Sequence, residues 1–328
     1  LEIALSGTGV AEPGITATPN SYTESLVSGE TTTAILSIEN TGGSILEWSL
    51  GTRPSTPGAF IFEKHDYADW TLTGNMDPIS PNVAITRQNE AGIFNIAQEG
   101  SFNSGISPSN TLWAFGYSGQ VDFSKYEEWR DAVDGNPPAM VNQQMSMYLV
   151  EENQFIDIKF LSWTENAEGG GFSYQRDATL QFVGFNSYSG VVNPAESVDV
   201  EVLFDATYLP AGVYEGFIQI NTNIPSNQLV EIPVSLTVSG NELIEVDPVT
   251  LDFGDIIVGA GGEESFIITN TGTDILEISS IVSDNELFTV DDLQTTILPG
   301  NFHEVGVLFS PSQLGEATPL LFLQLPLF

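Results

Sequence analysis

Short runs of alternating apolar and polar residues recur along the chain and predict β-strands, because successive side chains of a strand point to opposite faces. Thr32 to Glu39, Val198 to Phe204 and Leu229 to Val238 are examples, and Gly, Asn or Pro turn residues lie beside each run. Asn40 to Gly43 is predicted as the turn into a further strand at Ile45 to Leu50. The pattern therefore predicts an all-β protein.

One stretch of this pattern occurs twice. Gly29 to Gly42 and Gly259 to Gly272 share the same spacing between a glycine and an Asn-Thr-Gly turn. Directly after them, Ile45 to Glu47 recurs as Ile275 to Glu277. Repetition at a fixed spacing predicts tandem copies of one structural unit, and strands joined by turns favour a β-sandwich as that unit.

The beginning of the chain resembles the end of a repeat. Leu1 to Gly7 matches Val230 to Leu236 in its apolar and polar order, and each run starts 18 residues before a proline, Pro19 or Pro248. Since Val230 to Leu236 is predicted as the closing strand of a sandwich, residues 1–10 are predicted as the closing strand of a neighbouring sandwich.

In the C-terminal repeat, the given sequence contains no counterpart of this closing strand. Val307 to Phe309 aligns with Val202 to Phe204, and Leu321 to Gln324 aligns with Phe217 to Ile220. No counterpart of Leu229 to Val238 follows in the given sequence. Because the first residue is Leu rather than Met, we expect a processed chain or a piece of a longer one.

Residues 56–178 break the repeat and predict an inserted domain with its own core, since they hold four of the five tryptophans. Ser124 as N-cap, Glu127 completing a capping box and Gly135 as stop predict one short helix. Residues 51–58 are predicted as a linker by composition. The predicted organisation is a donor strand at 1–10, a split sandwich at 11–55 and 179–240, a mostly-β insert at 56–178, and a sandwich at 241–328 that lacks its last strand.

The chain carries 44 acidic against 7 basic residues, a formal net charge of −37. Such a surface repels phosphate backbones and anionic lipid, so we expect no nucleic-acid partner. No apolar run reaches the ~20 residues that span a bilayer, so we expect no membrane insertion. The absence of cysteine excludes disulfides, thiolate metal sites and cysteine nucleophiles.

Val246 to Gly254, Phe266 to Gly272 and Phe309 to Pro311 resemble the ASH or HYDIN-type immunoglobulin-like repeats, and the resemblance covers residues 243–325. The split sandwich is similar to related BACON-type domains. The resemblance implies tandem immunoglobulin-like β-sandwiches of secreted or cell-surface bacterial proteins. Ser6 to Gly9 supplies the Gly-Thr-Gly that ends the last strand of such a repeat, which supports the two-sheet sandwich completed by that strand.

The insert resembles an uncharacterised domain of secreted marine bacterial proteins, through Asp66 to Thr71 and Gly169 to Tyr174. This resemblance implies no activity. Paired carboxylates are too common in so acidic a chain to indicate a glycosidase, and no Gly-x-Ser-x-Gly motif accompanies the serines. We therefore expect no enzyme, and a secreted glycan-active enzyme is the third hypothesis.

Two weaker site hypotheses concern the insert. Calcium prefers several oxygen ligands, so it is the one cofactor that the loop carboxylates suggest, although solvated loops without a bound ion are the preferred explanation. The candidate ligands are Asp66, Asp69, Asp77, Asp131 and Asp134. Trp70 and Trp113 lie near predicted loops and are candidates for stacking on a sugar, whereas Trp129 and Trp163 are assigned to the core.

The ends of the chain carry the leading hypothesis. A sandwich without its last strand exposes unpaired backbone groups and part of its core, which β-augmentation by another chain can cover. Head-to-tail donation of residues 1–10 predicts a homopolymeric extracellular or cell-surface filament with the insert displayed on it. The predicted donor residues are Leu1, Ile3, Leu5 and Val10, and the predicted acceptor residues are Phe266, Ile268, Phe309, Leu321 and Leu323.

Two alternatives remain open at this point. In the first, the chain is one period of a longer tandem array, and the mismatch of its ends is a boundary effect. In the second, it is a polysaccharide-binding or adhesin module that uses the aromatic insert to bind a surface glycan.

Overall fold

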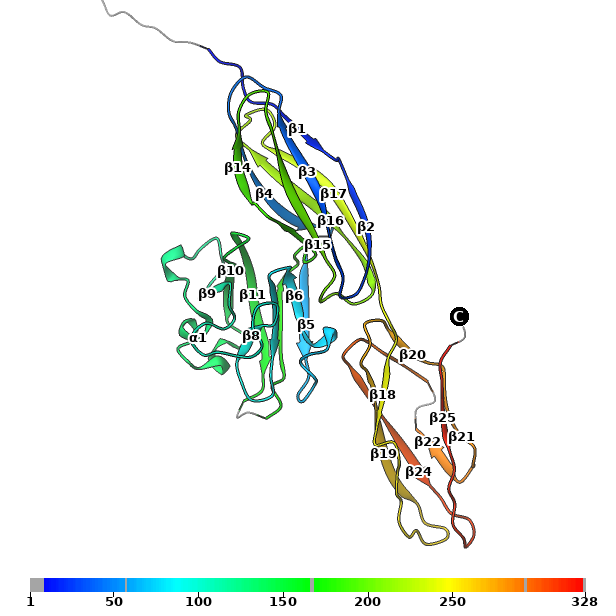
Figure 1. Ribbon diagram of the computed structural model, residues 1–328. Helices are drawn as coiled ribbons and strands as arrows, with labels where there is room; N and C mark the ends of the chain where they lie inside the picture. Colours follow the sequence, from blue (N-terminus) through cyan, green and yellow to red (C-terminus); the bar gives the residue numbers. More distant parts are fainter. Residues whose placement is uncertain (1–8, 57, 166–167, 292–293, 327–328) are drawn as a thin grey trace, which may run out of the picture. The chain divides into compact units, whose positions relative to one another are not determined.

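The computed structural model describes residues 9–56, 58–165, 168–291 and 294–326, and it divides into two compact units (Figure 1). The first unit contains the chain up to Tyr67 together with Asp77–Val238. The second contains Ala68–Met76 together with Ser239–Phe328. Strands dominate both units, which confirms the predicted all-β class.

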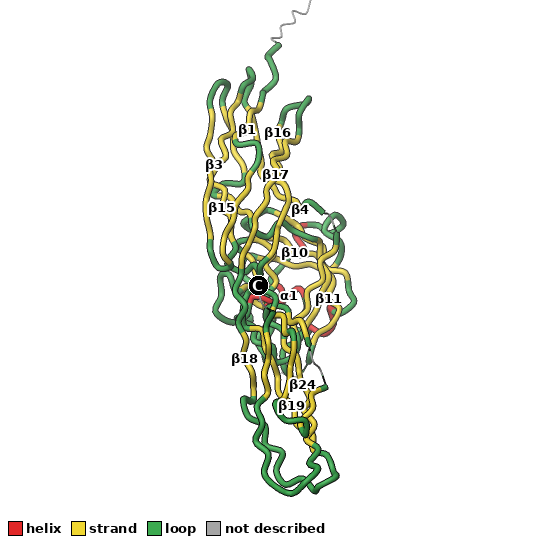
Figure 2. Tube along the Cα trace, turned by 90° about the vertical axis from the view of Figure 1, so that its right-hand side faces the viewer, coloured by secondary structure: helices red, strands yellow, loops and turns green. Residues whose placement is uncertain are grey.

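The first unit contains a two-sheet sandwich built from strands on both sides of the insert. One sheet has the order β1 (Ile15–Thr18), β3 (Thr31–Asn40), β15 (Ser197–Asp205), β13 (Val183–Phe185). The other has the order β14 (Ser189–Val192), β4 (Leu46–Pro54), β16 (Gly212–Thr222), β17 (Leu229–Ser239), β2 (Tyr22–Val27). Figure 2 places β3 and β15 on one side of this sandwich and β16 and β17 on the other.

Alternation of side chains explains why these strands pack into two layers. In β17, Ile232, Val234, Leu236 and Val238 are buried, while the residues between them face outward. The buried positions of β3 and β15 follow the same period and fill one core with those of β17. Pairing of Thr31 with Asp205 and of Glu39 with Ser197 closes the sheet across the insert.

The insert forms a second core within the first unit. A five-stranded sheet has the order β5 (Ala59–Lys64), β12 (Phe172–Asp177), β11 (Gln154–Trp163), β10 (Gln144–Leu149), β9 (Thr111–Phe115). A three-stranded sheet consists of β6 (Asp77–Ser80), β7 (Val83–Arg87) and β8 (Ile93–Asn95). The short helices are η2 (Phe123–Lys125), α1 (Trp129–Ala132) and η3 (Pro137–Met140). Trp129 and Phe160 are fully buried between these elements.

The second unit contains another sandwich, with smaller sheets. Its largest sheet has the order β18 (Ile244–Asp247), β19 (Gly262–Asn270), β24 (Phe302–Phe309), β22 (Phe288–Val290). Two strand pairs accompany it, β20 (Leu276–Ile278) with β23 (Thr295–Ile297) and β21 (Ser280–Ser283) with β25 (Leu321–Gln324). The segment Ala68–Met76 of this unit carries the short helix η1 (Thr73–Asn75).

Two local expectations are corrected. The predicted helix is only α1, because Glu127 lies in extended backbone that bridges Trp113, and Asp122 rather than Ser124 accepts the capping hydrogen bond in η2. Part of the predicted linker belongs to β4, which pairs with β16 as far as Pro54. The predicted turn at Asn40 to Gly43 is confirmed between β3 and β4, and it joins two different sheets.

A candidate strand-acceptor groove

Each sandwich has a buried asparagine at the point where the chain passes from one sheet to the other. The Asn40 side-chain amide donates to the carbonyl oxygens of Ser44 at 2.7 Å and Val192 at 2.9 Å. In the second sandwich, Asn270 donates to the carbonyl oxygens of Asp274 at 2.7 Å and Ile297 at 2.8 Å. Both asparagines are 0% exposed. The same buried network therefore marks equivalent positions in the two sandwiches.

The segments that enter the two sandwiches are also equivalent. The Gly43 backbone N–H donates to the Glu12 carbonyl, and the Thr273 N–H donates to the Asn241 carbonyl. Likewise, the backbone N–H of Thr41 donates to the Gly14 carbonyl, and that of Thr271 donates to the Leu243 carbonyl. Residue 241 thus corresponds to residue 12, an offset of 229 positions that the two hydrogen bonds define independently of the alignment.

A strand at the other end of the second sandwich corresponds to β16. In the first sandwich, buried Ile220 lies opposite buried Leu50. In the second, inward-facing Leu323 lies opposite buried Ile281. The repeat spacing would match Leu50 with Ser280, but the chain has one extra residue between β20 and β21, so the buried residue equivalent to Leu50 is Ile281. Leu323 therefore takes the place of Ile220, and Leu321 that of Ile218. This corrects the sequence alignment by one residue, since that alignment matched inward-facing Leu321 with Phe217, whose inward neighbours are Gly216 and Ile218.

The closing strand is the difference between the two sandwiches. In the first, β17 lies between β16 and β2. In the second, β25 pairs with β21 and with no other strand of the described chain. The residues that correspond to β2, 251–256, form no regular strand. Both neighbours of β17 thus have counterparts in the second sandwich, while the described residues contain no counterpart of β17 itself.

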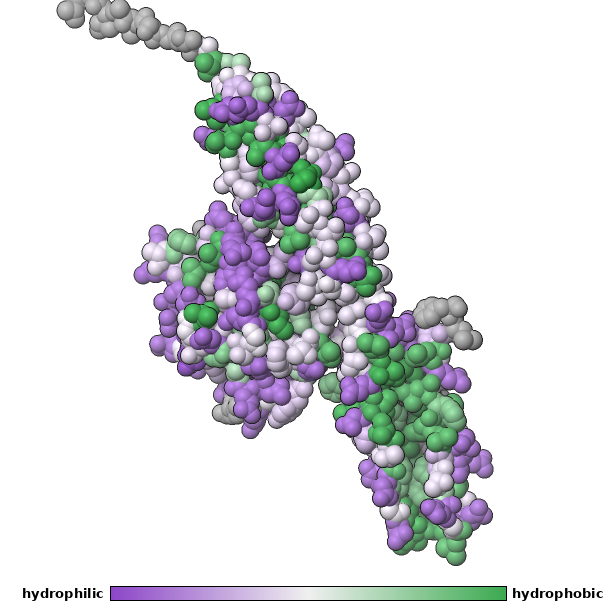
Figure 3. Space-filling model, in the orientation of Figure 1, coloured by the Kyte–Doolittle hydropathy of each residue, from purple (hydrophilic) through white to green (hydrophobic). Residues whose placement is uncertain are grey.

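A groove occupies this place. It has a volume of about 1010 Å³. Val246 and residues 248–256 line one wall, and residues 313–321 together with Leu323 line the other. Phe266, Phe288, Val307 and Phe309 also line it. Figure 3 shows apolar side chains gathered on the face of the second unit that is turned toward the viewer. The groove therefore opens the apolar core of the second sandwich along β25.

The alternation of half-buried and exposed side chains in β25 also extends into the residues just before this strand. Ala317, Pro319, Leu321 and Leu323 are half-buried, whereas Thr318, Leu320, Phe322 and Gln324 are exposed. This period of two indicates that residues 317–320 present one apolar face to the groove although only Leu321–Gln324 form a strand.

Most of the predicted acceptor residues line the groove. Phe266, Phe309, Leu321 and Leu323 do so, whereas Ile268 lies in the core at 0% exposure and does not line it. Sequence reasoning missed Phe253 and Phe288, whose rings contact each other with centroids 5.5 Å apart. Of the predicted donors, Val10 is 76% exposed, and Leu1, Ile3 and Leu5 lie outside the described residues.

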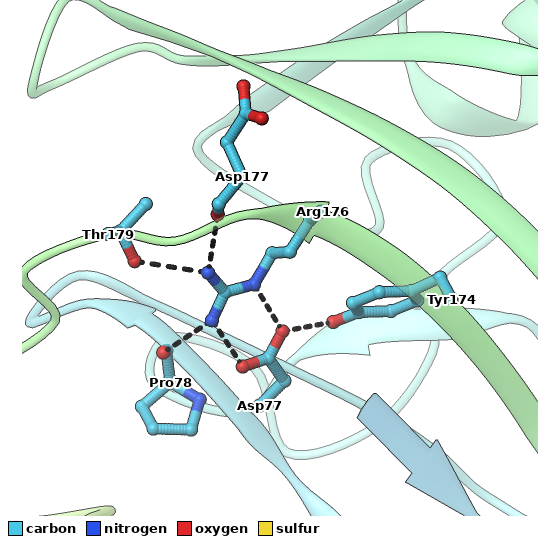
Figure 4. A network of polar contacts seen from close by, with 6 residues as sticks. All are labelled: Asp77, Pro78, Tyr174, Arg176, Asp177 and Thr179. Atoms are coloured by element: carbon cyan, nitrogen blue, oxygen red, sulfur yellow. Dashed lines mark hydrogen bonds and ion pairs between the residues drawn. The ribbon is translucent and has the colours of Figure 1, made fainter. Parts of the chain in front are cut away.

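Asp77, a predicted metal ligand, is instead buried against an arginine. Arg176 donates through Nη2 to Asp77 Oδ1 at 2.6 Å and through Nε to Oδ2 at 2.7 Å, and Tyr174 donates to Oδ2 at 2.6 Å (Figure 4). Burial opposes the charge of Arg176, but the Asp77 carboxylate raises its pKa overall. Burial and the same carboxylate raise the pKa of Tyr174 far above its ordinary value. The Asp77 carboxylate therefore accepts three hydrogen bonds and is paired with the buried guanidinium charge of Arg176.

The other four predicted metal ligands do not gather into one site. Asp66 accepts from the Gly171 N–H at 2.7 Å, and Asp69 accepts from the Thr71 N–H at 2.9 Å. Asp131 in α1 and Asp134 just after it are both exposed. The described residues contain no group of three or more His, Asp or Glu side chains placed to hold one ion. Calcium binding stays a prediction.

The predicted sugar-stacking pair is not an exposed platform. Trp113 is 0% exposed, because it lies on the inward face of β9 and donates through Nε1 to Thr111 at 2.8 Å. Trp70 is half-buried in the second unit. Trp129 is buried and Trp163 packs against the same core, as predicted. An aromatic cluster that sequence reasoning missed lies elsewhere on the insert.

This cluster consists of Phe123, Tyr126, Tyr148 and Phe155. The rings of Tyr148 and Phe155 lie with centroids 4.8 Å apart, and Phe123 meets Tyr148 edge to face at 5.0 Å. Phe123 is 54% and Phe155 41% exposed. Tyr148 and Phe155 are cross-strand partners in the hairpin of β10 and β11. Their equal distance from the turn at residues 151–152 is the signal that could have identified the pair in the sequence.

Residues 242–324 match the family model of the HYDIN/CFA65/VesB-like Ig-like domain. The match confirms the resemblance inferred for residues 243–325. No curated protein sequence matches the chain. No helix among the described residues is long and apolar enough to cross a membrane.

Solved structures with similar folds are distant in sequence. The ASH / PapD-like domain 7 of human CEP192 is 11% identical, with a TM-score of 0.28, over 73% of this chain and 93% of that domain. The CsuC-CsuE chaperone-tip adhesion subunit complex of Acinetobacter baumannii Csu pili is 8% identical, with a TM-score of 0.24, over 94% and 97%. Since both TM-scores lie below 0.5, the immunoglobulin-like fold rests on the sheet topology and the family match.

Proposed function

We propose that this protein is a structural subunit of an extracellular or cell-surface filament. Residues 1–10 of one subunit would enter the groove of the next as the missing closing strand. The proposal assigns no catalytic role, and the insert would be displayed on the filament. The observation that carries it is the open groove of the second sandwich at the place where β17 closes the first.

Burial energies explain why this groove favours an occupant. In the first sandwich, β17 contributes four side chains, Ile232, Val234, Leu236 and Val238, each at most 3% exposed. Burying one such side chain stabilises a protein by roughly 1.5–3 kcal/mol. The strand edge of β25 also offers backbone N–H and C=O groups to a new partner. An apolar strand that pairs with β25 would satisfy both the core and the edge.

The geometry of donation determines the kind of assembly. The donor lies at one end of the chain and the acceptor in the sandwich at the other, so the contact joins two different surfaces. A contact of this heterologous kind repeats from copy to copy and gives a filament or, if the rotation closes, a ring. Main-chain pairing would supply affinity, and the pockets for alternate side chains would supply specificity.

Electron microscopy and sedimentation of the purified protein test the proposal. Filaments are expected, and Ile3→Asp should abolish them, because it places a charge on the face predicted to enter the groove. Ala4→Asp is the matched control, since the neighbouring residue would face solvent. On the acceptor side, Leu321→Asp should block assembly, whereas Phe322→Asp, at a neighbouring position that is 46% exposed and does not line the groove, should permit it.

Two outcomes would contradict strand donation. A protein that stays monomeric at every concentration would favour the tandem-array hypothesis, in which a strand further along the same polypeptide fills the groove. Filaments that persist with Ile3→Asp would place the subunit contact elsewhere.

The aromatic cluster on the insert supports a second candidate function, the binding of a surface glycan. Exposed rings such as Phe123 and Phe155 suit stacking on a sugar face, and the net charge of −37 favours a neutral polysaccharide over an anionic one. Binding on a glycan array should be lost with Phe155→Ala and retained with Leu161→Ala, an exposed apolar residue further along the same strand. Equal binding by both variants would contradict this site.

A further inference from the structure

The structure assigns a register to the donated strand: Ile3 lies opposite Leu321 and Leu1 opposite Leu323. This inference rests on the proposed function, because it specifies how the donor fits the same groove. It goes beyond that function by stating which residues face each other and which end of the groove stays underfilled.

The first step is the offset between donor and closing strand. Because Asn241 and Glu12 occupy equivalent positions, as do Leu243 and Gly14, residues 1–10 precede their sandwich by the same number of positions as residues 230–239 precede the next one. Leu1 therefore corresponds to Val230, Ile3 to Ile232 and Leu5 to Val234. The last two of these β17 residues are buried, and Val230 packs against the same core.

The second step is the pairing of the closing strand. In the first sandwich, β17 pairs with β16 so that Ile232 lies opposite Ile218 and Val230 opposite Ile220. Leu321 and Leu323 take the places of Ile218 and Ile220 when buried Ile281, the partner of Leu323, is matched with buried Leu50. The counterparts of these residues then pair as Ile3 with Leu321 and Leu1 with Leu323. Continued along the half-buried positions of the wall, the register places Leu5 opposite Pro319.

The third step concerns side-chain volume. Beyond Leu5, the positions of buried Leu236 and Val238 correspond to Gly7 and Gly9. Opposite Leu236, the first sandwich has Tyr214, whose counterpart in the groove wall is Ala317. The donor strand and the groove wall therefore both have smaller side chains at this end of the groove than the closed sandwich has. The three apolar residues Leu1, Ile3 and Leu5 carry the apolar contact, and the end near the glycines stays underfilled.

Cysteine pairs test the register without background, because the chain has no other cysteine. Glu2→Cys in one copy should form a disulfide with Phe322→Cys in another, since these outward-facing residues are direct partners and a disulfide needs Cα atoms within about 7 Å. Glu2→Cys with Leu320→Cys, and Ala4→Cys with Phe322→Cys, are the controls, each two residues out of register. The mixed disulfide of each pair is quantified by mass.

The possible outcomes distinguish a wrong register from a wrong proposal of strand donation. Disulfides in the first pair alone support the register. Filaments with disulfides in a control pair instead overturn the register and leave strand donation standing. If no filaments form and no cysteine pair gives a disulfide, strand donation is overturned as well.

A gain of affinity provides a second measurement. Gly7→Leu should restore the side chain that Leu236 supplies in the closed sandwich and lower the critical concentration for assembly roughly tenfold, given the burial of one leucine. Thr8→Leu, on the outward face, should leave it unchanged. An equal effect of both variants, or weaker assembly with Gly7→Leu alone, would overturn the register.

Discussion

Phe288 and Phe309 stack with their ring centroids 4.3 Å apart and their planes 14° from parallel. They are cross-strand partners in β22 and β24, and both line the groove of the second sandwich. Phe253 meets both rings edge to face, at 5.5 and 5.8 Å. The aromatic end of the groove is therefore part of the core of the second sandwich as well as part of the surface that we propose to receive a strand.

Phe309→Leu should lower the free energy of unfolding of the second unit by about 1–2 kcal/mol, because an aromatic pair contributes ~0.5–1.5 kcal/mol beyond its burial. Phe204→Leu is the matched control, since Phe204 occupies the equivalent strand of the first sandwich, where it contacts Phe182 at 6.4 Å. Hydrogen exchange resolved by mass spectrometry assigns each loss to its unit. Destabilisation of the first unit by Phe309→Leu would contradict the separate cores.

Asp77→Asn should destabilise the insert by about 3–5 kcal/mol, because it leaves the buried charge of Arg176 without its partner. The side chains of Arg176 and Asp77 are 2% and 0% exposed. The control is Arg53→Gln, which breaks an ion pair with Glu231 whose side chains are 34% and 31% exposed. Exposed pairs contribute about 0–1 kcal/mol, so urea denaturation should separate the two variants clearly. Similar losses would contradict the role of burial.

Alkaline pH should weaken the first sandwich. Burial, and secondarily the charge of Glu24, raises the pKa of Tyr22 from 10.0 to about 12. A raised folded pKa means that the unfolded chain loses its proton first, so stability is complete below pH 10 and falls between pH 10 and about 12. Tyr22→Phe should make the decline of the urea midpoint over this interval shallower. An identical decline in both proteins would contradict the contribution of Tyr22.

Gly42→Ala and Gly272→Ala should each destabilise their own sandwich by about 1–3 kcal/mol, the usual cost of overpacking. A Cβ atom at Gly42 would lie 2.2 Å from the Gly14 nitrogen, and one at Gly272 would lie 2.2 Å from the Asn241 oxygen. Backbone atoms on both sides leave no room to yield. Gly51→Ala is the control, because a Cβ atom there meets nothing within 4 Å. Thermal unfolding should show losses for the first two variants only.

Filament assembly should accelerate with salt if subunits join as proposed. Each subunit carries a formal net charge of −37, so approaching copies repel one another. Raising ionic strength shortens the screening length to about 8 Å at 0.15 M and 3 Å at 1 M, which weakens that repulsion. Light scattering at several sodium chloride concentrations measures the rate. Assembly that slows with salt would indicate a contact dominated by attraction between opposite charges.

Local patterns were sufficient to predict many of the strands. The alternation in residues 229–238 corresponds to β17, and that in residues 32–39 corresponds to β3, because one buried face imposes a period of two on any strand. Gly135, predicted to stop the helix, has a φ of 64°, which glycine adopts without strain.

Errors occurred where a residue's role depends on distant parts of the chain. The carboxylate of Asp77 resembled a metal ligand until the fold placed Arg176 against it, 99 residues away. Trp113 resembled an exposed ring, but the pairing of β9 with β10 turns it inward.

By itself, the sequence determined the all-β class, the repeat, and the prediction that the second sandwich lacks a closing strand, because alternation and repeat spacing are local properties. Only the tertiary structure decided the phase of β25 and the groove, since both depend on which strand lies beside which. Leu321 and Phe322 are equally apolar in sequence, and the pairing of Leu323 with Ile281 decides which of them faces the core. A one-residue shift exchanges the two faces of a strand, so register comes from long-range contacts.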